Sequence, residues 1–231
     1  MNKLKKFLIV SAAVLTVGGV GSASFAGSAS ANNNGDDWNR QGKHKKDNAP
    51  NDPWKVFHFL QKNIEEVKKG GPLLHEHTSL VVPLLKAQSE GSADLAAVTA
   101  AVDANSVQVA ETVDKLYPGS KDQFLDLWRK HINAYTDYLN AAKANDQAGK
   151  DAAKQKLEDF SNDAPTLLDT ISDRLYRAGL TEKLKEHTTE TLATIDAMVA
   201  GDWATVYAKA HMSYEKMTVI SVELLLGAKL K

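Results

Sequence analysis

The sequence predicts an all-α protein, a helical bundle of about seven helices. Three observations support this fold class. From residue 52 onward, apolar residues recur at the three-to-four-residue spacing of a helix face. No segment between turn signals alternates apolar and polar residues as a half-buried strand would. Three histidine-centred segments repeat with the same helix stop and start signals downstream. We therefore expect a leading helix followed by three helical hairpins, each carrying a histidine.

The first 31 residues have the pattern of a secretory signal peptide. A lysine-rich start precedes an apolar stretch at 7–20, and Ala-Ser-Ala at 29–31 fits the cleavage motif. The apolar stretch is too short, and too rich in glycine, for a membrane span of ~20 residues. We expect cleavage before Asn32 and a mature protein that is secreted, with no membrane span.

Charge and cysteine content exclude several classes of function. The chain has no cysteine, which excludes a disulfide scaffold, a thiolate metal site and a catalytic thiol. Of the 28 basic residues, three lysines lie in the predicted signal, so 25 remain against 29 acidic residues, a net charge of −4. A nucleic-acid partner needs a basic face, so this balance argues against one.

A polar linker and one folded domain follow the predicted signal. Residues 32–51 are rich in Asn, Asp and Lys, and we expect them to be disordered because they have little apolar surface to bury. Residues 52–231 are expected to form a single all-helical repeat domain. Asp52 and Pro53 suit a helix start, and Gly70-Gly71-Pro72 predicts the end of this leading helix.

The three predicted hairpins are marked by His77, His131 and His187, which are 54 and 56 residues apart. Each histidine has a large apolar residue three positions before it. A pair of residues that suits a left-handed turn and a helix N-cap begins fourteen residues after each histidine. These pairs are Gly91-Ser92, Asn145-Asp146 and Gly201-Asp202. The second helices are expected to end near Pro118-Gly119, Gly179 and Gly227.

The repeated histidines are candidate ligands for a transition metal or haem. Each lies on an apolar helix face, so each hairpin directs one imidazole inward, and His211 lies at the margin of another such face. Imidazole suits zinc and copper, and it also serves as an axial ligand of haem. No two ligands are paired one turn apart, so each must come from a different helix. Only a closed bundle, and not an open stack of hairpins, would bring them to one ion.

Other interpretations of these residues stay open at this stage. The histidines could form a buried packing layer, with Asn105, Asp103 or Asp159 as hydrogen-bond partners. An enzyme would need a deep polar pocket around His131, and no catalytic motif is present. A groove for an extracellular protein or small ligand would use exposed aromatic side chains as anchors. The candidates are Tyr117, Trp128, Tyr135, Tyr138, Tyr176, Trp203, Tyr207 and Tyr214.

One stretch of the sequence resembles a known type of domain. Residues 124–132, Phe-Leu-Asp-Leu-Trp-Arg-Lys-His-Ile, are the most specific part, and residues 103–107, 184–187 and 210–212 extend the similarity. They resemble a secreted all-helical domain of spore-forming Gram-positive bacteria that often carries the label "copper amine oxidase". The resemblance covers roughly residues 55–228. It implies a secreted helical module and does not imply amine oxidation.

Together these observations predict a secreted, non-catalytic helical module with a binding or structural role. The alternative is a protein that binds copper, zinc or haem through His77, His131, His187 and His211.

Overall fold

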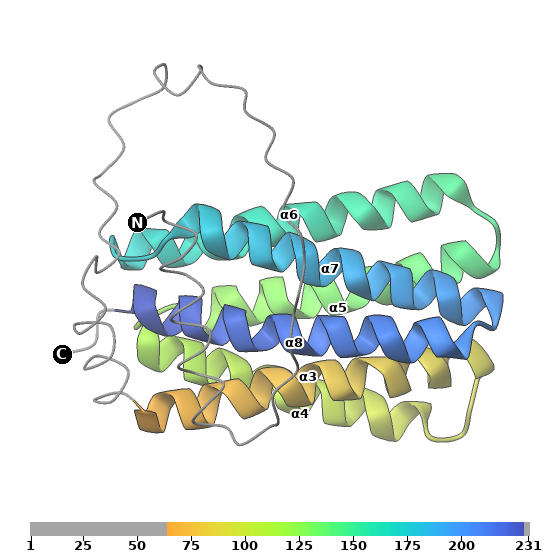
Figure 1. The fold of residues 1–231 in the computed structure, drawn as a ribbon, viewed down its shortest axis with the longest axis horizontal. Coiled ribbons are helices and arrows are strands. Elements are labelled where there is room, and N and C mark those ends of the chain that lie inside the picture. The colour runs from red at the N-terminus through yellow and green to blue at the C-terminus, as the bar shows by residue number, and fades with distance from the viewer. Residues whose placement is uncertain (1–63, 229–231) are drawn as a thin grey trace, which may run out of the picture. The chain divides into compact units, whose positions relative to one another are not determined.

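Six long helices run side by side in the computed structural model (Figure 1), which confirms the all-α fold class. The structure describes residues 64–228, so the predicted signal peptide, the polar linker and residues 52–63 of the predicted leading helix lie outside the described part. The helices are α3 (Ile64–Glu90), α4 (Leu95–Leu116), α5 (Lys121–Lys143), α6 (Gln147–Ile171), α7 (Arg177–Ala200) and α8 (Trp203–Gly227). None of these helices is long and apolar enough to cross a membrane.

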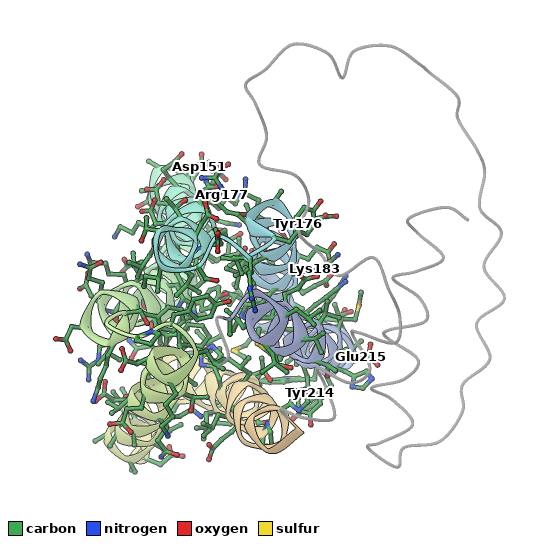
Figure 2. All side chains as sticks on the ribbon, turned by 90° about the vertical axis from the view of Figure 1, so that its left-hand side faces the viewer. Asp151, Tyr176, Arg177, Lys183, Tyr214 and Glu215 are labelled. Atoms are coloured by element: carbon green, nitrogen blue, oxygen red, sulfur yellow. The ribbon has the colours of Figure 1, made fainter. Side chains whose placement is uncertain are left out.

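The six helices form a closed bundle. Each helix packs against the next one along the chain, and the last helix, α8, packs extensively against the first, α3. Helix α5 also contacts α3 and α7, which places these three helices close to one another. The view along the helices shows the same closed arrangement (Figure 2). Helices α3, α5 and α7 carry the repeated histidines, so these residues can meet only because the bundle is closed.

Helix α5 illustrates why these segments are helical and which face they bury. Its buried side chains recur every three or four residues, which is the period of one helix face. They include Phe124, Trp128, His131, Tyr135 and Tyr138. Between the histidines and the three hairpin turns, apolar side chains from five helices pack into one core.

The three predicted hairpin turns are confirmed. Gly91, Asn145 and Gly201 all have positive φ angles, of 63°, 54° and 74°, as a left-handed residue after a helix requires. Asp146 and Asp202 act as predicted N-caps, because their carboxylates accept the backbone N–H groups three residues further on. The same offset from each histidine therefore places all three turns at corresponding positions.

Two of the predicted helix boundaries are wrong. Ser92 is not the N-cap of α4: that position belongs to Asp94, whose side chain makes no capping bond, and the helix begins at Leu95. Gly179 does not end α6, which ends at Ile171; it lies in the first turn of α7. A side chain at Gly179 would collide with the ring of Tyr176, so this glycine provides room and not a helix stop.

The predicted end of the leading helix at Gly70-Gly71-Pro72 is also wrong. Helix α3 continues through these residues to Glu90, so its first part and the first histidine-bearing helix are one element. This is why the described part has six helices where about seven were expected. A Cβ added at Gly70 would lie 3.6 Å from Cγ2 of Thr112 on α4, and one at Gly71 would lie 3.9 Å from Oγ of Ser221 on α8, which are ordinary contact distances. Helix α3 packs against both α4 and α8, and this tertiary packing outweighs the poor helix propensity of the glycines.

Candidate metal centre

His77, His131 and His187 meet near the middle of the bundle. They come from α3, α5 and α7, and none is more than 2% exposed. One nitrogen from each imidazole can be chosen so that all three lie within 4.8 Å of one another. No carboxylate of residues 64–228 belongs to this group. Because each histidine lies fourteen residues before its turn, the three hairpins bring them to the same height.

The distance between two of these imidazoles suits two ligands of one metal ion. Nε2 of His77 lies 3.4 Å from Nε2 of His131. This is longer than the usual 2.7–3.2 Å range of a hydrogen bond from nitrogen. Two nitrogens bound to the same zinc ion at about 2.0–2.1 Å in tetrahedral or trigonal geometry would lie about 3.3–3.6 Å apart. Nε2 of His77 and Nε2 of His131 are thus already spaced for a shared ion, and the nitrogen of His187, within 4.8 Å of the other ligand atoms, would move closer to bind it.

Aromatic rings enclose the three histidines. The ring of Trp128 lies 4.8 Å from His77 and 4.7 Å from His131, centroid to centroid. Phe160 of α6 stacks on His131 at 4.3 Å, and Tyr135 meets the same imidazole edge-on at 5.5 Å. These contacts fix the orientation of His131 and exclude water. Sequence reasoning did not single out Phe160, whose only signal is its place on the apolar face of α6.

His187 is held by hydroxyl groups. Its Nδ1 lies 2.8 Å from Oγ of Ser213 on α8, and that oxygen lies 3.2 Å from Oγ1 of Thr191. Thr191 in turn donates to the backbone carbonyl of His187, at 3.0 Å. The other ring nitrogen of His187, Nε2, is buried and has no hydrogen-bond partner within residues 64–228. The available signal for Ser213 and Thr191 was their polar character on otherwise apolar helix faces.

Burial keeps all three imidazoles neutral. Desolvation lowers the pKa of His77 to about 3, and the nearby His187 lowers it further. Desolvation also lowers the pKa of His187 to about 3, against a smaller opposite effect of Ser213. The pKa of His131 is held well below its usual value by burial and by the other two histidines. Neutral imidazole is the form that binds metals, so no proton must be displaced at neutral pH.

His211 does not join the other three histidines. It lies on the surface of α8 with an exposed side chain, and its Nε2 is 3.4 Å from a carboxylate oxygen of Glu215. Its position at the margin of the apolar stripe put it on the solvent side of α8. His75 is also apart from the cluster: its Nε2 lies 2.9 Å from Oγ1 of Thr218, and its ring stacks on Tyr214 at 4.1 Å. Figure 2 shows Tyr214 on the side of α8 that faces α3.

The proposed hydrogen-bond partners of the histidines lie elsewhere. The Asn105 amide donates to the carbonyl of Leu73 at 3.0 Å, one turn before His77, and to a carboxylate oxygen of Glu76 at 2.9 Å. Asp103 forms an exposed ion pair with Arg129. Asp159 accepts a hydrogen bond from Gln155 within α6. None of these contacts gives a histidine ring a partner.

The arrangement suits a small cation better than haem or a reacting substrate. The three imidazoles and their aromatic neighbours lie in van der Waals contact, so a macrocycle would not fit between them without repacking. Trp128, Tyr135 and Tyr138 are also buried, which makes them core residues and not groove anchors. The aromatic candidates that are exposed are Tyr176, Trp203, Tyr207 and Tyr214.

Comparison of the chain with protein-family models, with curated proteins and with solved structures finds no match. The resemblance noted from residues 124–132 therefore stays an expectation, and the functional argument depends on the geometry of the histidines.

Proposed function

We propose that this protein binds one transition-metal ion through His77, His131 and His187. The observation that carries the proposal is the spacing of the imidazole nitrogens. The Nε2 atoms of His77 and His131 are 3.4 Å apart, and the third histidine offers a nitrogen within 4.8 Å of both. Three separate helices supply these ligands, so metal binding would link α3, α5 and α7.

An unpaired ring nitrogen of His187 favours a metal site over a packing layer. Nε2 of His187 is buried and has no hydrogen-bond partner among the described residues. Leaving a buried polar atom unsatisfied costs about 1–3 kcal/mol, and a layer that served packing alone would be expected to pair this atom. An apolar residue of similar size would fill the same space without this cost.

The donor set favours zinc or copper. Imidazole nitrogen binds both ions well, whereas magnesium and calcium prefer oxygen ligands. No carboxylate among residues 64–228 takes part, so this part of the chain gives no negative charge to balance a divalent ion. The metal with the lower charge, monovalent copper, would therefore be desolvated at a smaller cost than divalent zinc. Both ions belong in the first test.

A closed site of this kind suits a non-catalytic role. Catalytic zinc sites also use three protein ligands, but they keep a position open to water and substrate. Here the ligands are at most 2% exposed, inside a bundle whose apolar core covers them. We therefore propose metal binding that serves stability, storage or transfer. The exposed aromatic residues of α8 are the candidate contacts for an extracellular partner.

We further propose that the protein acts outside the cell, with residues 1–31 removed. The lysine-rich start, the apolar stretch and the Ala-Ser-Ala motif support this location. Determining the N-terminal residue of protein recovered from the culture medium tests the proposal directly. Asn32 is the expected first residue, whereas retention of the full chain inside the cell would contradict it.

The metal proposal is tested on protein purified without a metal-affinity column. The protein is stripped with a chelator and titrated with zinc and with copper kept in the monovalent state. We expect one equivalent to bind and to raise the unfolding temperature, because a ligand that binds only the folded state stabilises it. Single replacements of His77, His131 and His187 by Gln should each weaken binding.

The matched control is His211→Ala, which removes an exposed imidazole and should leave the stoichiometry and affinity unchanged. Folding of each variant is checked by its helical circular dichroism before the titration. A wild-type protein that stays folded, binds neither metal and gains no thermal stability from either would overturn the proposal. The three histidines would then be a packing layer.

A further inference from the structure

We infer that Ser213 and Thr191 are positioning residues that hold His187 in one tautomer, with hydrogen on Nδ1 and a free lone pair on Nε2. This inference deepens the proposed function and rests on it, because a bare Nε2 is the form in which His187 would bind a metal. It adds a further layer of residues to the site, supplied by α7 and by α8, a helix that contributes no histidine to the cluster.

The side chains of Thr191 and Ser213 and the ring of His187 share three hydrogens: two on hydroxyl groups and one on the neutral ring. Thr191 has one hydroxyl hydrogen and donates it to the carbonyl of His187, 3.0 Å away. The hydroxyl oxygens of Thr191 and Ser213 lie 3.2 Å apart, a long hydrogen bond in which Ser213 is the donor because Thr191 has already used its hydrogen. Once Ser213 donates to Thr191, its oxygen can only accept at the 2.8 Å contact with Nδ1 of His187. The hydrogen of that bond must come from Nδ1.

The opposite direction of this hydrogen-bond chain is unfavourable. If Ser213 donated to Nδ1, the hydrogen of His187 would lie on Nε2. That nitrogen is buried and has no hydrogen-bond partner. A buried donor without an acceptor is among the rarest features of folded proteins, whereas a bare imidazole lone pair beside aromatic rings costs less. The network therefore selects the tautomer with hydrogen on Nδ1.

This tautomer gives His187 the arrangement found in most metal-binding histidines. Such residues usually direct one ring N–H to an oxygen atom nearby and present the other nitrogen to the ion. At His187 the oxygen belongs to Ser213, which is 4% exposed and is itself held by Thr191. The ring is thus oriented before any metal arrives, so binding should require little rotation of this ligand.

The first test is nitrogen NMR of the metal-free full-length protein at pH 7.5, with the histidine rings labelled. The two ring nitrogens of a neutral imidazole differ strongly in chemical shift according to which one carries hydrogen. We expect Nδ1 of His187 to show the shift of a protonated nitrogen and Nε2 that of an unprotonated one. The reverse pattern, or averaging of the two tautomers, would overturn the inference whether or not the protein binds metal.

The second test compares zinc affinity among variants. Ser213→Ala removes the acceptor, so His187 should lose its single tautomer and zinc should bind about 10–100-fold more weakly, as for other partners of metal-bound histidines. Ser213→Thr keeps a hydroxyl and should restore most of the affinity. Ser106→Ala is the matched control, because that buried hydroxyl bonds only to the carbonyl of Val102 in its own helix.

These outcomes separate the inference from the proposed function. Wild-type protein that binds zinc while Ser213→Ala leaves both the affinity and the His187 tautomer unchanged would refute the positioning role and keep the metal site. Wild-type protein that has the expected tautomer but binds no metal would refute the metal site and keep the hydrogen-bond network. Equal losses in Ser213→Ala and Ser106→Ala would show general destabilisation and would also refute the positioning role.

Discussion

Acidification should destabilise the metal-free protein at a pH well above the range in which ordinary carboxylates titrate. The ordinary pKa of histidine is 6.5, and burial lowers the pKa of His77 and His187 to about 3 in the folded protein. Between these values the unfolded chain binds protons that the folded protein cannot. Stability is therefore fully present above pH 6.5 and is lost as the pH falls toward 3.

The size of the loss follows from the same pKa values. At pH 5.0, a histidine with an unfolded pKa of 6.5 and a folded pKa near 3 loses about 2 kcal/mol relative to pH 7.5. His131 has its pKa shifted in the same direction by burial and by the other two histidines. His77 and His187 together lose about 4 kcal/mol, and His131 adds to this loss; 4 kcal/mol is already a large part of the 5–15 kcal/mol that typically stabilises a domain.

Glu223 opposes this trend. Its carboxyl group is 6% exposed, and burial raises its pKa from 4.5 to about 7, with Lys183 acting weakly against burial. A raised carboxyl pKa gives stability that is present below pH 4.5 and lost as the pH rises through 7. At pH 5.0 it restores about 2 kcal/mol, so His77, His187 and Glu223 together leave a net loss of about 2 kcal/mol, to which His131 adds. In a domain of this size, 2 kcal/mol corresponds to about 4–8 °C in unfolding temperature.

The assay is urea unfolding of chelator-treated protein, followed by circular dichroism between pH 7.5 and 5.0. Between pH 5.0 and 6.0, His77 and His187 less Glu223 give a slope of about 1.4 kcal/mol per pH unit, because each proton contributes about 1.4 kcal/mol, and His131 makes the slope steeper. Glu223→Gln should steepen the slope further, by about 1.4 kcal/mol per pH unit. A stability that is flat across this range, or a Glu223→Gln variant with the wild-type slope, would refute the reasoning.

Three further predictions concern core packing, a helix N-cap and an exposed ion pair. Phe160→Ala should lower the free energy of unfolding by about 3–5 kcal/mol, because Phe160 is 3% exposed and stacks on His131. Thermal unfolding measures this loss, and a value below about 1 kcal/mol would contradict the prediction. Asp146→Ala should lower the free energy of unfolding by about 1 kcal/mol because it removes an N-cap, whereas Ser92→Ala removes no cap and should lower it much less. Urea unfolding measures both variants, and equal losses would argue against the cap assignments. Arg129→Ala should change stability by less than 1 kcal/mol, because its ion pair with Asp103 is exposed, and 0.5 M salt should abolish even that difference.

Local signals in the sequence were sufficient to locate most of the hairpins. Gly91, Asn145 and Gly201 were identified as turn residues because left-handed backbone favours Gly and Asn, and this preference acts within a few residues. The same kind of local rule failed at Gly70-Gly71-Pro72 and at Gly179. At Gly70 and Gly71 the helix continues because α3 packs against α4 and α8, which are formed by later parts of the chain, and Gly179 leaves room for the ring of Tyr176. A single sequence does not distinguish a glycine that ends a helix from one that lies inside it.

The candidate site was predicted in part. The apolar faces of three helices placed His77, His131 and His187 in the interior, and their equal distance from the turns placed them at one height. His211 was included because it lies at the edge of such a face. A helix face of about 100° leaves residues at its edge undecided, and their exposure depends on how closely the neighbouring helix packs.

The sequence by itself determined the fold class, the hairpin turns and the inward direction of one histidine from each hairpin, because helical period and turn chemistry act over short stretches of chain. Only the tertiary structure decided that these histidines meet. Packing of α8 on α3 closes the bundle, which brings the imidazoles within 4.8 Å of one another instead of about a helix diameter apart. The contact of Ser213 with His187 arises in the same way, because it depends on side chains from two helices that touch only after the chain has folded.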